Sequence, residues 1–179
     1  MDSKSRHSLR LKICRWAIRK YRYKEGSKWD ALRARCFARL MERAGEDIKI
    51  RSGVFIKEPQ HIQMGSRISI QENCYLSGFG GLVIGNDVSM GTGTYIFTST
   101  HPITCDVIRN TPLEKRPVVL GNDIWLGAGV RVMGGVTIGD HVAVGAGAVV
   151  TQDLPSNGVY AGIPARKLRD LIGNTTVEA

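Results

Sequence analysis

Histidine and cysteine are the residue types in this sequence that most readily do chemistry, and the chain contains four of each. The four cysteines are widely scattered, at Cys14, Cys36, Cys74 and Cys105. They form no CxxC pair and no Cys/His cluster with zinc-finger spacing. The pattern therefore favours reduced thiols in a cytosolic protein over a disulfide framework.

His101 is the histidine with the most suggestive setting, in the tripeptide Thr100-His101-Pro102. A neutral imidazole accepts a proton from a substrate at physiological pH, so a histidine displayed on a loop is a candidate general base. The alternative is an ordinary loop residue. His7 lies in a basic segment, and His141 follows Asp140 at an expected turn, so both are interpreted as solvent-exposed.

The segment around His101 interrupts a repeat, in which an aliphatic residue recurs every six positions and glycine often follows it. The repeat runs through Ile50, Ile56, Met64, Ile70, Leu76, Ile84, Met90, Ile96, Leu120, Leu126, Val132, Ile138, Val144 and Val150. Two intervals are eight residues long, and about 18 extra residues near 97–119 leave the pattern. A rigid scaffold that extrudes one loop is a common place for chemistry.

Short fixed periods indicate stacked repeats. Six residues supply one short strand and one tight turn, so three such units close a triangular coil. The aliphatic residue then points into the prism, and each coil pairs in parallel with its neighbours. The glycine that follows relieves the corner, where a side chain would crowd or where φ is positive. The sequence therefore predicts a mostly β protein, a parallel β-helix of about five coils over residues 47–179 with a C-terminal tail.

Residues 1–46 form a separate basic segment. Up to Gly45 there are 14 Lys and Arg against four Asp and Glu, a charge of +10, whereas the remainder has 11 against 12 and carries −1. The segment predicts two amphipathic helices, the first with Leu9, Ile13, Trp16, Ala17 and Tyr21 at helical spacing. The second begins at Ser27, which with Asp30 forms a possible cap, and ends at Gly45.

Such a basic segment suggests an anionic partner: a lipid head group, an acidic polysaccharide, nucleic acid or an acidic face of its own oligomer. Nucleic acid is the weakest of these because no recognised binding motif accompanies the charge. The alternative is a purely structural role, in which the two helices form a hairpin that packs over one end of the β-helix. No apolar stretch approaches a membrane span and no secretory signal is evident, so we expect a soluble, cytoplasmic protein. At the other end, residues 165–172 predict a short helix that carries Arg166, Lys167 and Arg169.

Several motifs in this order resemble the hexapeptide-repeat acyltransferases, whose β-helix is left-handed. They are Ile84-Gly85-Asn86-Asp87-Val88, Thr100-His101-Pro102-Ile103, Gly121-Asn122-Asp123-Ile124-Trp125-Leu126-Gly127, Val136-Thr137-Ile138-Gly139-Asp140, Val144-Gly145-Ala146-Gly147-Ala148-Val149-Val150-Thr151 and Gly162-Ile163-Pro164-Ala165. The resemblance covers roughly residues 50–171. It is closest to the galactoside, maltose and nodulation acetyltransferases and to the O-acetyltransferases of O-antigen and capsule synthesis.

This resemblance implies that His101 is the catalytic base and that Asn73 orients it or binds the acceptor, although an asparagine ladder at a turn is a credible alternative for Asn73. The family places a carboxylate a few residues after that asparagine. Residues 77–81 contain none, so the acceptor contacts must differ from those of the galactoside and maltose enzymes.

The resemblance also implies a site for acetyl-CoA between neighbouring prisms of a homotrimer. The matching positions are Trp125, the backbone N–H of Ala128, Gly145, Ala146, Thr151, Arg166 and Arg169. Gln152 stands where the family often has lysine, which removes one expected phosphate contact. His61, His101 and His141 lack the close pair found in hexapeptide carbonic anhydrases, so no metal is expected.

The expected activity is therefore O-acetylation of a sugar or polysaccharide hydroxyl. N-acetylation of a nucleotide-linked amino sugar is the enzymatic alternative, and a non-catalytic scaffold is the alternative of another class. Peripheral contact of the basic helices with an anionic membrane is compatible with each.

Overall fold

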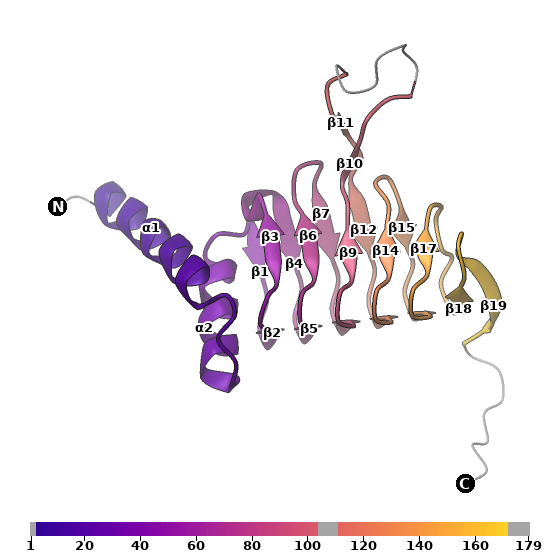
Figure 1. The fold of residues 1–179 in the computed structure, drawn as a ribbon, viewed down its shortest axis with the longest axis horizontal. Helices are drawn as coiled ribbons and strands as arrows, with labels where there is room; N and C mark the ends of the chain where they lie inside the picture. Colours follow the sequence, from indigo (N-terminus) through magenta and orange to yellow (C-terminus); the bar gives the residue numbers. More distant parts are fainter. Residues whose placement is uncertain (1–2, 104–110, 172–179) are drawn as a thin grey trace, which may run out of the picture.

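The computed structural model describes residues 3–103 and 111–171, and it is dominated by short strands wound into a three-sided prism (Figure 1). We call the three sides sheets A, B and C. Sheet A contains β1 (Arg43–Ala44), β4 (Ile62–Met64), β7 (Leu82–Ile84), β12 (Val118–Leu120) and β15 (Thr137–Ile138). Sheet B contains β2 (Ile48–Ile50), β5 (Ile68–Ile70), β8 (Val88–Met90), β13 (Ile124–Leu126), β16 (Val142–Val144), β18 (Gly158–Ala161) and β19 (Arg166–Asp170). Sheet C contains β3 (Phe55–Lys57), β6 (Tyr75–Ser77), β9 (Tyr95–Ile96), β14 (Arg131–Val132) and β17 (Val149–Val150).

Within each side of the prism, strands from successive coils pair in parallel, and only β19 pairs antiparallel within these three sheets of the described chain. The fold is the left-handed β-helix predicted from the sequence, but it has about six turns instead of five. The additional turn comes from β1, which precedes the predicted repeat and pairs with β4, and from the residues after Val150. Leu154 there forms a parallel bridge to Ile138, and β18 pairs with β16.

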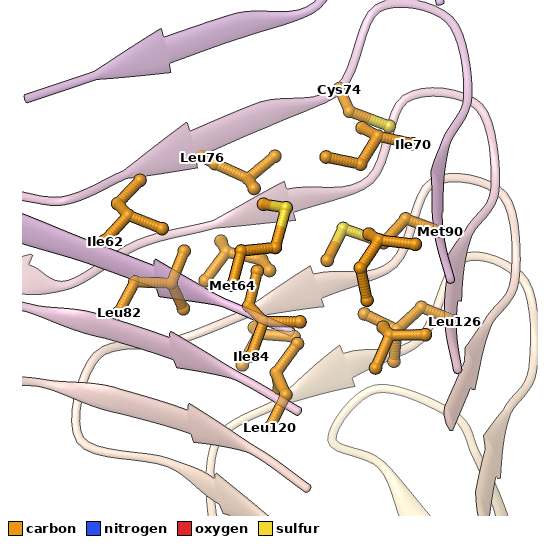
Figure 2. Close-up of a cluster of buried hydrophobic side chains, with 14 of the residues drawn as sticks. Ile62, Met64, Ile70, Cys74, Leu76, Leu82, Ile84, Met90, Leu120 and Leu126 are labelled. Carbon is orange, nitrogen blue, oxygen red and sulfur yellow. The ribbon is translucent and has the colours of Figure 1, made fainter. Parts of the chain in front are cut away.

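The predicted aliphatic column is the core of the prism. Every one of its members is buried, and residues from successive coils stack directly on one another in Figure 2, as Met64, Ile84 and Leu120 do. The two eight-residue intervals are accommodated at the corner between sheets C and A. The first holds the 3-10 turn Pro59–His61, and the second holds the glycine-rich residues 77–81.

The two predicted helices are α1 (Ser3–Tyr21) and α2 (Ser27–Ala38), which lie beyond one end of the prism (Figure 1). The predicted end of the second helix at Gly45 is wrong, because α2 stops at Ala38 and Arg43–Ala44 already form β1, paired with β4. Ser27 makes no capping hydrogen bond, and Asp30 binds Arg33 instead. Pairing with the first coil thus takes precedence over continuation of the helix.

The predicted C-terminal helix is also wrong. Its described part is strand β19, which turns back and pairs antiparallel with β18, placing Arg166 opposite Ala161 and Arg169 opposite Val159. A helix as short as residues 165–172 is marginal alone, whereas the last strand of the solenoid offers an unpaired edge whose hydrogen bonds β19 completes. The remainder of the predicted tail lies outside the described residues. No helix in the described ranges is long and apolar enough to cross a membrane.

Candidate active site

The predicted loop that carries His101 leaves the prism after β9, and the structure shows that its stem is a two-stranded hairpin (Figure 1). Its arms are β10 (Ser99–Thr100) and β11 (Glu114–Lys115), paired antiparallel. His101 follows β10 directly and is exposed, with Nδ1 3.4 Å from the Thr111 hydroxyl oxygen. The imidazole is thus presented to solvent from the end of a paired stem.

A buried threonine that sequence reasoning missed anchors this hairpin. Thr98 is fully buried, its hydroxyl donates to the Ser77 carbonyl at 3.1 Å, and its carbonyl accepts from Arg116 N–H at 2.9 Å. Gly80 donates its N–H to the Thr98 hydroxyl at 2.9 Å, and a Cβ on Gly80 would lie 1.9 Å from the Thr98 carbonyl oxygen. The glycine-rich residues 77–81 therefore pack against the base of the hairpin. They are the feature of the sequence from which the role of Thr98 could have been predicted.

Asn73 lies at the corner between β5 and β6, in left-handed conformation with φ of 57°. It lines a cleft of 390 Å³ with aromatic side chains of sheet C and two residues that follow α1. The lining comprises Arg22, Tyr23, Gly53, Phe55, Asn73, Cys74, Tyr75, Tyr95 and Phe97. Asn73 and His101 stand at opposite ends of the strands of sheet C, so this protomer alone does not bring them together.

The aromatic side chains of this cleft form a continuous set. The rings of Phe55 and Tyr75 stack with centroids 5.8 Å apart, and Tyr75 lies 5.8 Å from Phe97. The guanidinium of Arg22 lies over the Phe55 ring at 4.6 Å. Phe97 is followed immediately by the buried foot of the hairpin, so the cleft extends to the base of the His101 stem.

The predicted donor-site residues other than Thr151 lie on sheet B and at its corner with sheet C. Trp125 is in the middle of β13, points outward with 57% of its surface exposed, and stands in register between Ser89 and Ala143. Ala128 and Ala146 occupy equivalent corner positions one coil apart, where Gly147 donates its N–H to the Ala128 carbonyl at 2.8 Å. Within the described ranges, the Ala128 N–H has no hydrogen-bond acceptor.

The C-terminal arginines approach this corner through β19. A Cβ on Gly145 would lie 3.0 Å from the Ala161 Cβ, and Ala161 is paired with Arg166. Arg166 and Arg169 are exposed, and neither forms an ion pair within the described part of the chain. Lys167, by contrast, binds Asp170 at 2.6 Å, and this hydrogen bond raises the pKa of Lys167. Thr151 is exposed after β17, at the other end of the strands of sheet C.

The other histidines do not join these groups. His141 sits at the corner between sheets A and B with φ of 57°, and its Nδ1 contacts the Asp123 carboxylate. His61 is exposed at the end of the 3-10 turn. Over residues 3–103 and 111–171, no three His, Cys, Asp or Glu side chains are grouped as metal ligands.

Comparison with known proteins agrees with this geometry. Residues 117–152 match the family described as bacterial transferase hexapeptide (six repeats). Galactoside O-acetyltransferase of Escherichia coli is 32% identical over 123 residues, covering 65% of this chain and 61% of that protein. Its Lactococcus lactis counterpart is 35% identical over 114 residues, covering 62% of this chain and 55% of that protein. The chain thus spans less than two thirds of the length of these relatives.

A solved structure matches nearly the whole chain. The hexapeptide-repeat acetyltransferase of Vibrio cholerae, in complex with acetyl coenzyme A, superposes with a TM-score of 0.79 at 25% identity and covers 93% of this chain and 89% of its own. The chain thus carries the hexapeptide repeat over residues 117–152, and it has the left-handed β-helix fold of the hexapeptide-repeat acetyltransferases to which it is similar.

Proposed function

We propose that this protein transfers an acetyl group from acetyl-CoA to a sugar or polysaccharide hydroxyl, with His101 as general base. The observation that carries the proposal is an exposed imidazole on a hairpin stem whose foot is buried in a rigid prism. A sugar hydroxyl is a poor nucleophile at neutral pH, and an imidazole that accepts its proton during attack increases its reactivity.

The residues on sheet B and its corner fit the donor. Acetyl-CoA, when bound, supplies the activated acetyl thioester. Ala128 N–H has no acceptor within the described chain and is available to a thioester oxygen, where charge develops during transfer. Gly145 and Ala146 would contact the pantetheine arm from this corner, Thr151 would contact it from the other end of sheet C, and Trp125 would line the groove. Within the residues that the structure describes, the guanidinium groups of Arg166 and Arg169 form no ion pair, and such groups suit CoA phosphates.

Asn73 is better suited to bind the acceptor than to orient His101. It lines the aromatic cleft of sheet C, and half-exposed aromatic rings with a few polar groups form an adaptable binding surface. His101 and Asn73 are separated within one protomer, so joint action requires two protomers. A homotrimer with sites at the subunit contacts would supply this arrangement and would cover part of the exposed Trp125.

Replacement of His101 tests the proposal. We expect His101→Ala to lower kcat at least about a hundredfold while leaving CoA affinity and oligomeric state nearly unchanged, because the exposed ring makes no core contact. His141→Asn is the matched control, since asparagine tolerates the left-handed backbone there. Near-normal turnover of His101→Ala would show that another residue is the general base. Sedimentation that shows an active monomer would contradict the proposed trimer.

Acetyl-CoA with a panel of glycan acceptors, read by mass spectrometry, would identify the substrate. Turnover on a nucleotide-linked amino sugar would favour the alternative N-acetylation, and absence of acetyl-CoA binding would favour a non-catalytic scaffold. We place the protein in the cytoplasm, in polysaccharide biosynthesis, because its proposed donor is a cytoplasmic metabolite and its proposed acceptors are glycan precursors.

A further inference from the structure

Among its described residues, helix α1 has two apolar faces, and only one of them is covered. Cys14, Ala17 and Ile18 are buried and form part of the continuous hydrophobic core. Tyr21, on the same face, stacks on Trp29 of α2 with ring centroids 4.5 Å apart. At 100° per residue this buried face is centred about 130° around the helix from Leu9.

The second apolar face of α1 consists of Leu9, Ile13 and Trp16, spaced four and three residues apart. Their side chains are 47%, 53% and 54% exposed. The sequence alone groups these residues with Ala17 and Tyr21 on one docking face. In the structure Ala17 is buried whereas these three side chains are exposed, and Trp16 contacts the Tyr21 ring edge-on with centroids 5.9 Å apart. Three large apolar side chains in a row along a helix form a patch that is costly to leave in water.

Basic side chains border this second face. Lys20 Nζ lies over the Trp16 ring at 4.7 Å from its centroid. The surrounding surface is lined by Lys12, Arg15, Trp16, Arg19 and Lys20. Arg10 lines an adjoining hollow with Ile13. Glu58 shares a groove with Arg15 and Arg19, yet none of the α1 cations from Arg10 to Lys20 forms an ion pair within the described part of the chain.

We propose that α1 lies on an anionic lipid bilayer, with Leu9, Ile13 and Trp16 among the head groups and the bordering cations on acidic lipids. An apolar stripe that ends in tryptophan and is flanked by Lys and Arg has the composition of an interfacial helix. A second copy of this chain would bring the same positive charge to the contact. An acidic peptide would match the charge but would have to supply its own apolar surface. A bilayer that contains acidic lipid offers both.

The position of α1 is compatible with a working enzyme. The helix lies beyond one end of the prism, the His101 hairpin projects from the middle, and β19 closes the far end (Figure 1). A protein attached through α1 therefore keeps the hairpin and the C-terminal coils away from the lipid surface. The attachment is independent of the proposed acetyl transfer, because no residue of the second apolar face lines the proposed site.

Vesicle co-sedimentation of the full chain tests the proposal. The probes are phosphatidylcholine vesicles with and without phosphatidylglycerol, at low and high salt. We expect binding to the anionic vesicles, little binding to the neutral ones, and weakening by salt because the attraction is electrostatic. Ile13→Ser with Trp16→Ser should lower the partition coefficient at least about tenfold. Arg15→Gln with Arg19→Gln should lower it by a similar factor, since each cation near an anionic surface contributes about fivefold.

Matched controls lie on the prism. Val83→Ser removes an exposed apolar side chain of sheet A, and Lys49→Gln removes an exposed cation of sheet B. Both should bind vesicles like the unmodified protein. Circular dichroism and sedimentation of each variant check fold and oligomeric state.

Two results would overturn the proposal. One is a full chain that does not bind anionic vesicles at low salt. The other is that Ile13→Ser with Trp16→Ser dissociates the oligomer while vesicle binding is unaffected, which would make the face a protein contact. Neither result bears on acetyl transfer, which is measured separately with soluble acceptors.

Discussion

Replacing Arg33 with methionine tests how the N-terminal helices are joined to the prism. Arg33 is 1% exposed, and its guanidinium donates to three backbone carbonyls from different segments. The acceptors are the carbonyls of Ile50 at 3.0 Å, Tyr21 at 3.0 Å and Lys24 at 2.7 Å. A fourth bond joins it to the buried carboxylate of Asp30. One side chain thus connects the end of α1, α2 and the first coil.

The cost of removing this group follows from those bonds. Arg33→Met leaves three carbonyls without this donor, at about 1 kcal/mol each, and leaves Asp30 with Arg51 as its remaining partner at 2.8 Å. Burial lowers the pKa of Arg33 and Asp30 raises it, with burial the larger effect. Methionine does not carry the cost of burying a charge, so part of the lost stability is regained. We expect a net decrease of about 3–5 kcal/mol in the free energy of unfolding, as for other buried pairs that lose one partner.

Denaturant unfolding followed by far-ultraviolet circular dichroism measures the effect. Arg33→Lys keeps the charge, but a single ammonium cannot reach acceptors served by three nitrogens, so we expect it to recover less than half of the loss. Arg51→Met is the control, because its side chain is 43% exposed and its pair contributes about 1 kcal/mol or less. A loss below about 1 kcal/mol for Arg33→Met would refute the reasoning.

Two further predictions concern the glycines of the corner and the buried thiols. A Cβ on Gly91 would lie 2.5 Å from Ala128 N, so Gly91→Ala should cost about 1–3 kcal/mol and lower kcat by displacing the proposed oxyanion donor. Gly93→Ala is the control, because a Cβ there meets open space although φ is +69°. It should lower the free energy of unfolding by about 1 kcal/mol and leave kcat unchanged. Equal kcat values in the Gly91→Ala and Gly93→Ala variants would contradict the proposed role of Ala128. Burial and the neighbouring Cys14 thiol raise the pKa of Cys36 to about 11. Cys36 therefore remains a neutral thiol in the folded chain at pH values at which the same thiol ionises in the unfolded chain, near pH 9. The contribution of Cys36 to the free energy of unfolding is fully present below pH 9 and is lost as the pH rises toward 11. Peptide mapping after brief alkylation at pH 8 should leave Cys36 unmodified, and rapid modification would show that it is accessible.

Much of the prism could be predicted from the sequence because its period is set by the backbone. A strand of three residues and a tight turn occupy six positions, so inward-pointing residues must recur at that interval wherever the coil continues. Each member of the aliphatic column is accordingly buried, and the one long interruption is the His101 hairpin. Local periodicity carries this information without reference to distant residues.

Why glycine follows the aliphatic residues of the repeat could be decided only from contacts with the neighbouring coil. The sequence left two explanations open, crowding or positive φ. Gly91 has no positive φ, and a side chain there would collide with the backbone of Ala128 in the next coil. The left-handed residues lie two positions further on, at Gly93 and its equivalents, including Asn73.

The ends of the prism depended still more on tertiary contacts. Composition predicts a helix for the segment that forms β19. The segment instead pairs with the free edge of β18, whose backbone hydrogen-bonding groups are in place only once the solenoid has assembled. In α1, helical periodicity identifies the residues that share a face, yet it does not say which of two apolar faces meets the core. The sequence alone determined the prism, its interior and its hairpin. The position of α2 and the first coil decided that Cys14 and Ile18 are covered and that Leu9, Ile13 and Trp16 remain exposed, because burial depends on which surface lies opposite.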